Sequence, residues 1–140
     1  MQMLDMETPT SYALMTRKIE VTVEPVYLQR ESNTEVGRHV WAYTIRITNF
    51  SDEAVRLMSR HWRITDANGN LQEIQGDGVV GEQPVLKPGD EFEYTSGVPL
   101  ATPSGFMVGT YQMEDAEGQP FDIEIPAFSL DSPDANALIN

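Results

Sequence analysis

Short runs of alternating apolar and polar residues, separated by turns rich in Gly, Pro, Asn and Asp, extend through most of this 140-residue chain. In the clearest run, residues 39–50, Trp41, Tyr43, Ile45 and Ile47 fall on alternate positions. A period of two predicts a strand that buries one face. No amphipathic stretch is long enough to form the helix that connects parallel strands, so antiparallel pairing is predicted. The run at residues 39–50 is expected at the centre of a sheet.

Six further runs with the same period predict the other strands. They cover residues 18–25, 55–66, 71–75, 92–98, 106–114 and 121–125. We therefore predict an all-β fold, an antiparallel β-sandwich of immunoglobulin or fibronectin type III style with seven to eight strands. A closed barrel is the alternative, because the number and spacing of strands do not separate the two.

Three features predict local irregularities in these strands. The apolar phase changes between Leu57 and Trp62, which indicates a β-bulge near residues 58–60. Pro25 cannot donate a ladder hydrogen bond, so its strand is expected at a sheet edge or with a bulge. Pro126 is expected to end regular strand pairing. The predicted division of the chain is a flexible N-terminal extension (1–16), one domain (17–130) and a C-terminal tail (131–140).

Charge and composition exclude several classes of partner. The chain has 9 basic and 22 acidic residues, and every Lys and Arg lies between Arg17 and Lys87. An acidic surface repels phosphates, so no nucleic-acid partner is expected, and the acidic C-terminal part is either a solvated face or a surface for a basic partner or cations. The absence of cysteine fits a cytoplasmic protein. No stretch approaches the roughly 18 apolar residues of a membrane span, so no membrane association is expected.

Gly76, Gly78 and Gly81 match the G-x-G-x-x-G pattern of dinucleotide-binding loops. That motif holds a pyrophosphate only when it opens a helix, whose first amides bind the phosphates. Pro84 and then Pro88 follow too closely to leave room for a helix. In this glycine loop, defined as residues 76–84, the glycines are expected either to provide the backbone angles of a tight sandwich loop or to present successive amides to an anion.

The chain offers little for catalysis or metal binding. His39 and His61 are the only histidines, predicted respectively to start a strand and to lie on a polar surface, so a catalytic triad is not expected. Their spacing does not suit zinc or cobalt. Glu114, Asp115 and Glu117 could hold a hydrated Mg²⁺, but an acidic turn facing water is favoured. We therefore expect no catalytic residue, no metal site, no cofactor and no enzymatic activity.

Seven strings, in order within residues 17–130, resemble those of a known family. They are IEVTV (19–23), WAYTI (41–45), RHW (60–62), GDGVVGEQP (76–84), YTSG (94–97), GFMVGTY (105–111) and IPAF (125–128). In these strings the chain is similar to the ApaG domain family, once catalogued as a domain of unknown function. The resemblance implies a fibronectin type III-like sandwich, a bacterial cytoplasmic source, and an association with cobalt and magnesium resistance or efflux. It implies no accepted catalytic mechanism. Eukaryotic relatives, among them F-box proteins and a polymerase-delta-interacting protein, imply a protein-interaction module.

The expected function is therefore a non-enzymatic sandwich that binds another protein through the glycine loop and adjoining turns. The candidate partner-binding residues are Gly76, Gly78, Gly81, Glu82, Arg60, His61, Arg63 and Phe106. The alternative is a small-molecule sensor that binds a phosphate- or pyrophosphate-containing ligand at the glycine loop, with Arg60, His61 and Arg63 supplying charge. Phe106 and Met107 are expected to be exposed anchors for a partner, and Trp41 and Trp62 are expected in the core. Any link to cations is expected to be indirect.

Overall fold

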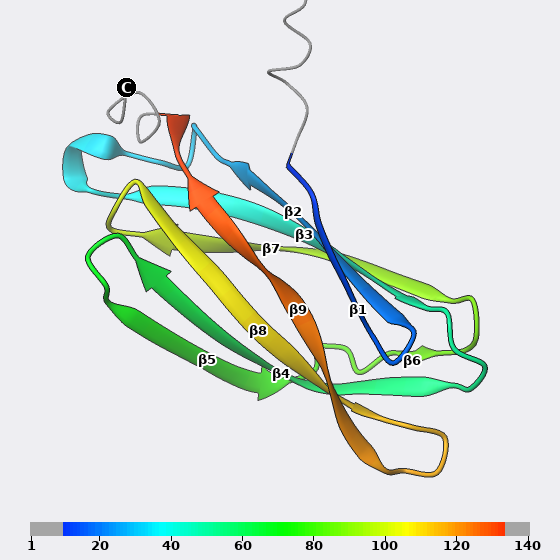
Figure 1. Ribbon diagram of the computed structural model, residues 1–140. Helices are drawn as coiled ribbons and strands as arrows, with labels where there is room; N and C mark the ends of the chain where they lie inside the picture. Colours follow the sequence, from blue (N-terminus) through cyan, green and yellow to red (C-terminus); the bar gives the residue numbers. More distant parts are fainter. Residues whose placement is uncertain (1–9, 134–140) are drawn as a thin grey trace, which may run out of the picture.

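The computed structural model describes residues 10–133, which form two antiparallel sheets packed face to face (Figure 1). The first sheet has the order β1 (Tyr12–Thr16), β2 (Ile19–Tyr27), β3 (His39–Asn49) and β7 (Glu91–Leu100). The second has the order β5 (Leu71–Asp77), β4 (Val55–Asp66), β8 (Ser104–Glu114) and β9 (Pro120–Asp131), and β6 (Val85–Leu86) also pairs with β4. A short 3-10 helix, η1, covers Thr34–Val36. The predicted antiparallel β-sandwich is confirmed, and the short strands β1 and β6 add to the strands predicted from periodicity.

The core lies between the inner faces of the two sheets, where alternate side chains of each strand are buried. Trp41 and Ile47 on β3 are 1% and 0% exposed, and β3 lies between β2 and β7 as predicted. Trp62 of β4 meets Tyr43 of β3 edge-on with 5.5 Å between ring centroids, and meets Phe128 of β9 at 6.0 Å. Both tryptophans are therefore core residues, as predicted, and edge-to-face aromatic contacts join the two sheets.

The N-terminal strand corrects one prediction. Residues 1–16 are predicted to be a flexible extension, but Tyr12–Thr16 form β1 and pair with β2. Arg17 and Lys18 make the connecting turn with φ of +52° and +64°, the two positive values of a type I′ hairpin. Such turns usually contain Asn and Gly, so Arg-Lys is no hairpin signal, and the exposure of β1 removes the apolar alternation. Residues 1–9 lie outside the described part of the chain.

Two bulges interrupt the second sheet. The register between β4 and β8 shifts after Leu57, which confirms the predicted bulge. A second shift after Met107 places two residues of β9, Pro126 and Ala127, opposite one residue of β8. Regular pairing is interrupted at Pro126, as predicted, but it resumes at Phe128, because the bulge accommodates a residue without an amide hydrogen and β9 continues beyond it. Pro25 lies past the part of β2 that pairs with β1, where β2 is a sheet edge as predicted.

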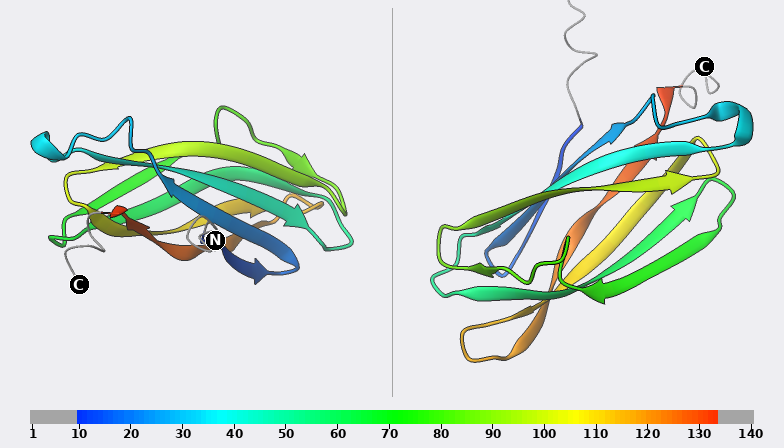
Figure 2. Two further views of the ribbon diagram at one scale, coloured as in Figure 1. Left: turned by 90° about the horizontal axis from the view of Figure 1, so that it is seen from above. Right: turned by 180° about the vertical axis from the view of Figure 1, so that it is seen from behind.

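Along one side of the sandwich the edge strands β1 and β9 of the two sheets lie side by side, and along the other side the edge strands are β7 and β5 (Figure 2). On the first side, called here the closed side, β1 packs against β9: the Thr16 hydroxyl accepts from the Glu124 amide at 3.2 Å, and the Tyr12 hydroxyl accepts from the Ser129 amide at 3.3 Å. On the opposite side, called here the open side, β5 and β7 are the edge strands. The glycine loop follows β5 on this side, and its valines line the same cavity as Tyr94 of β7.

Candidate functional site

The glycine loop folds as a tight hairpin and not as the start of a helix. Val79 and Glu82 exchange two backbone hydrogen bonds of 2.8 Å, and Val80 and Gly81 make the turn between them with φ of +41° and +82°. Gly78 has φ of +64°, and a Cβ atom there would overlap the Glu82 carbonyl oxygen. The loop leads into β6, which confirms that no helix follows the glycines.

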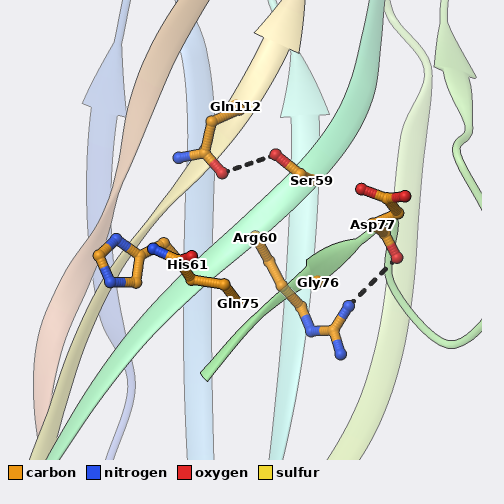
Figure 3. A pocket seen from close by; sticks show the side chains of 7 residues that line it. All are labelled: Ser59, Arg60, His61, Gln75, Gly76, Asp77 and Gln112. Carbon is orange, nitrogen blue, oxygen red and sulfur yellow. Dashed lines mark hydrogen bonds between the residues drawn. The ribbon is translucent and has the colours of Figure 1, made fainter. Parts of the chain in front are cut away.

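Side chains and backbone of β4 hold the loop in place. The Met58 carbonyl, at the bulge, accepts from the Gly78 amide and from the side-chain amide of Gln83, both at 2.8 Å. Arg60 donates to the Gly78 carbonyl at 2.8 Å and to the Asp77 carbonyl at 3.2 Å, the second of which is drawn in Figure 3. The bulge that the sequence predicts is therefore the anchor of the loop.

The two valines of the loop lie in opposite environments. Val79 is fully buried, whereas Val80 is 57% exposed at the tip. Val80 also has a positive φ of +41°, which is sterically unfavourable for a β-branched residue. The loop thus presents an exposed apolar side chain on a strained and well-anchored backbone.

The protein itself uses three of the amides that the sequence suggests as an anion nest. The loop amides that donate to carbonyls of the chain are those of Gly78, Val79 and Glu82. Arg60 also donates to carbonyls of the loop. Among the described residues, the turn amides left for a ligand are those of Val80 and Gly81. The tip of the loop therefore offers an anion two amides, while the guanidinium of Arg60 is held by the backbone.

The remaining predicted residues of β4 lie on two different faces of the sheet. After the bulge, Arg60 shares the inner phase of β4 with Trp62. His61 and Arg63 have the opposite phase and belong to the outer face, which points away from the first sheet. The predicted basic group of Arg60, His61 and Arg63 is therefore split between the two faces.

The two predicted anchors on β8 also differ. Phe106 is 48% exposed, as predicted, but it lies on a strand opposite Thr65 and away from the glycine loop. Met107 is 1% exposed, so its predicted exposure is wrong. Successive side chains of the strand β8 point to opposite faces of the sheet, so Met107 points into the core because Phe106 faces solvent.

An open cavity of about 500 Å³ lies beside the glycine loop (Figure 3). It is lined by Ser59, Arg60, His61, Gln75, Gly76, Asp77 and Gln112. His61 Nε2 is 2.9 Å from the Glu73 carboxylate, and the Ser59 hydroxyl donates to the Gln112 side chain at 2.8 Å. Ser59 and His61 thus bond to different neighbours, which is not the nucleophile–base contact that nucleophilic catalysis requires.

A second cavity, of about 170 Å³, lies between the sheets next to Val80. It is lined by Tyr43, Arg60, Trp62, Val79, Val80, Tyr94 and Ser96. Behind it, the buried hydroxyls of Tyr94 and Tyr111 share a hydrogen bond. Burial raises the pKa of Tyr94, of Tyr111 and of Tyr43 above the usual tyrosine value. Sequence reasoning missed this cluster, because periodicity does not reveal which strands face each other across the core.

Asn49 is another residue that sequence reasoning missed. It is fully buried, and its side-chain amide donates to the Glu53 and Leu86 carbonyls at 2.9 Å each. Its side-chain oxygen accepts from the Ser51 amide at 2.9 Å. One side chain therefore joins the end of β3, the turn before β4, and β6. In the sequence Asn49 stands only as the first residue of a polar turn cluster.

Carboxylates gather at the turn between β8 and β9. Oxygens of Glu53, Asp115 and Glu117 lie within 4.8 Å of one another. This group includes Glu53 in place of Glu114, which the sequence suggested. Asp115 accepts from the amides of Glu117 and Gln119 at 2.9 Å each, and Glu53 accepts from a further turn amide at 3.3 Å. Through these hydrogen bonds the carboxylates of Asp115 and Glu53 cap the turn, which explains why they lie close together.

The bulge, the anchored glycine loop and the two antiparallel sheets define a small β-sandwich domain, which differs from the nucleotide-binding α/β proteins that share the glycine pattern. The sequence pattern of the ApaG domain matches residues 29–115. The chain belongs to the ApaG domain family, which confirms the resemblance found in the sequence.

Relatives in bacteria cover nearly the whole chain. The protein ApaG of Bradyrhizobium sp. (strain ORS 278) is 61% identical over 129 residues, which are 92% of this chain and 99% of that protein. The crystal structure of an ApaA protein from Bordetella pertussis has a TM-score of 0.80 at 47% identity, over 82% of this chain and 94% of that chain. The C-terminal domain of Wzt shares the fold alone, with a TM-score of 0.52 at 12% identity over 89% of this chain and 79% of that chain. Over residues 10–133, no helix is long and apolar enough to span a membrane.

Proposed function

We propose that this chain is a non-enzymatic protein-interaction module of the cytoplasm that holds a partner protein at the glycine loop. The observation that carries the proposal is Val80, an apolar side chain that is 57% exposed on a residue with φ of +41°. A left-handed conformation costs an L-residue with a Cβ atom about 1–2 kcal/mol, so this backbone is unfavourable for the isolated molecule. Strained positions concentrate where a ligand or partner is bound.

The anchoring of the loop supports the same function. Buried Val79 and the hydrogen bonds from Arg60 fix the loop before a partner arrives. A preorganised apolar anchor lowers the conformational entropy lost on binding, and such anchors contribute strongly to protein interfaces. The phosphate-sensing alternative has less support, because the loop offers two turn amides and Arg60 is engaged.

The family's association with cobalt and magnesium resistance would then be an effect of the partner. The carboxylates of Asp115 and Glu53 already accept hydrogen bonds from the turn, which explain their positions without a bound ion. The absence of cysteine supports a reducing compartment.

The proposal is tested with a photo-crosslinking residue placed next to Val80, at Glu82, in cells that express the full chain. We expect a protein adduct that is lost in Val80→Gly, whose free energy of unfolding should be unchanged or about 1 kcal/mol higher because strain is relieved. The matched control is Val36→Gly in η1, since Val36 is 71% exposed and has no positive φ. An adduct unaffected by Val80→Gly, or no adduct, contradicts the proposal.

A further inference from the structure

The strand that precedes the glycine loop has a free edge. Within the described residues β5 pairs with β4 on one side only. Its sequence, LQEIQGD, contains no Pro and no Lys, and its register with β4 is regular from Leu71 to Asp77. Edge strands are usually interrupted or shortened to prevent pairing with another chain. β5 has neither feature.

The hydrogen-bonding pattern shows which groups of β5 face outward. Gly78 donates to the Met58 carbonyl, and Asp66 donates to the Asn70 carbonyl, at the two ends of the β4–β5 ladder. Because hydrogen-bonded pairs alternate in an antiparallel ladder, the even-numbered residues of β5 bond to β4. The amides and carbonyls of Glu73 and Gln75 therefore point away from the sheet and are available to a further strand.

Side chains of β5 leave apolar surface uncovered. Ile74 pairs with Trp62 and so faces the first sheet, yet it is 40% exposed at the open side. The cavity of about 170 Å³, lined by Val80 and Trp62, lies on the same inner side of the sheet. An added strand would place every second side chain beside Ile74 and over this cavity.

The charge of the open side indicates the chemistry of the partner. Its two edge strands, β5 and β7, carry four acidic residues and no basic one: Glu73, Asp77, Glu91 and Glu93. Arg46 pairs with Glu91 and Glu93 of β7, and Arg60 donates to loop carbonyls, so the carboxylates of β5 carry the charge that a partner at this edge would meet. His61 contacts Glu73, and Arg63 lies opposite it on β4. A second copy is disfavoured, because the chain has a net charge of −13 and would pair an acidic edge with itself.

We propose that β5 binds an extended, basic segment of the partner protein as an additional strand. The segment alternates basic and apolar side chains: the basic ones lie beside Glu73 and Asp77 on the outer face, and the apolar ones lie beside Ile74 on the inner face. Main-chain hydrogen bonds to Glu73 and Gln75 hold it, and Val80 contacts its end. The inference rests on the proposed function and specifies the partner of the same surface.

The test is a selection from a display library of random peptides about twelve residues long, which is long enough to span β5, against the full chain. We expect peptides with Lys or Arg at alternate positions, β-branched residues between them and no Pro. Gln75→Pro removes the amide hydrogen that would bond to the peptide, but it removes no hydrogen bond between β5 and β4. It should weaken peptide binding about tenfold or more. The matched control is Thr95→Pro on β7. By the same alternation of hydrogen bonds the amide of Thr95 points away from β3, so this variant should leave the affinity for the peptides unchanged.

Two further variants keep the test decisive. If Gln75→Pro does not fold, Glu73→Lys with Asp77→Lys preserves the backbone and should weaken binding of the selected peptides by about tenfold or more. The proposal is overturned if no peptide is recovered, if the recovered peptides are acidic or rich in Pro, or if Thr95→Pro and not the β5 variants abolishes binding. If crosslinking near Val80 succeeds while this selection fails, strand addition is wrong and the interaction function stands. Failure of both rejects the function.

Discussion

The three glycines of the loop are alike in the sequence but differ in their surroundings. A Cβ atom at Gly78 would overlap the Glu82 carbonyl oxygen, whereas one at Gly81 would meet nothing within 4 Å. Both have positive φ. We expect Gly78→Ala to lower the free energy of unfolding by about 3 kcal/mol or more, because strain and overlap add, and Gly81→Ala to lower it by about 1–2 kcal/mol. Urea denaturation of both variants measures the difference, and equal losses would contradict the described packing.

The buried tyrosines make stability depend on pH in the alkaline range. Burial raises the pKa of Tyr94 and Tyr111 in the folded state. Above the unfolded pKa of about 10 the unfolded chain loses these protons and the folded chain keeps them, so stability is complete below that pH and falls as pH rises. Each group contributes a slope of about 1.4 kcal/mol per pH unit.

Urea denaturation between neutral and alkaline pH measures this slope. Tyr94→Phe with Tyr111→Phe removes both hydroxyls of the pair together, leaves no unpaired partner and should flatten the dependence. A wild-type curve that stays flat above pH 10 would show that the hydroxyls are solvated.

Sequence periodicity identifies core residues better than it identifies residues of the site. Trp41 and Trp62 lie in strong alternations and are buried, as predicted. The assignment of Met107 failed, because an exposed Phe106 on a strand requires its neighbour to be buried. The strain at Val80 has no sequence signal, since a positive φ at valine arises from a hairpin that the flanking residues impose.

The β1–β2 hairpin contains relievable strain. Lys18 has φ of +64° in a turn that favours glycine. We expect Lys18→Gly to raise the free energy of unfolding by about 0.5–1 kcal/mol. Glycine relieves the strain of the positive φ, and the greater entropy that it gives the unfolded chain offsets part of that gain. Arg17 is left in place because its guanidinium lies 4.1 Å from the Phe121 ring centroid. Thermal denaturation measures the gain.

The control for this hairpin is Lys87→Gly. Lys87 precedes the Pro88-Gly89 turn and has no positive φ, so glycine there relieves nothing. It should leave stability unchanged or lower it. A gain of similar size in both variants would indicate a general effect of removing lysine and not strain at the hairpin.

At the scale of elements, the predictable strands are those with one buried face. The alternation at residues 39–49 and the phase change after Leu57 identified β3 and the bulge of β4. β1 is mostly exposed and β6 has two residues, so neither has a readable period. β9 continues past Pro126 because its pairing with β8 contains a bulge that accommodates the proline. The position of that bulge depends on β8 and cannot be read from the sequence of β9 alone. The placement of the loop between the sheets depends on pairings that a single sequence does not contain.

The net charge of −13 affects the whole molecule. Mutual repulsion of carboxylates opposes compact folding and is screened by salt, so we expect the melting temperature to rise with NaCl. MgCl₂ and CoCl₂ are compared with NaCl at equal ionic strength, and any rise in melting temperature beyond that in NaCl should persist in Asp115→Asn. A rise abolished by Asp115→Asn would instead indicate direct ion binding at the turn between β8 and β9.

The contact between β1 and β9 has a practical consequence for how this domain can be attached to other things. Tyr12 opens the first strand, Ser129 lies near the end of the last, and they meet on the closed side. A linker that joins the residue before Tyr12 to the residue after Ser132 would permit a circular permutant with new ends elsewhere, because Leu130 and Ser132 are buried and must be kept. Fusion or surface immobilisation through either strand would likewise leave β5 and the glycine loop facing solvent, so a copy tethered there keeps the proposed recognition surface accessible.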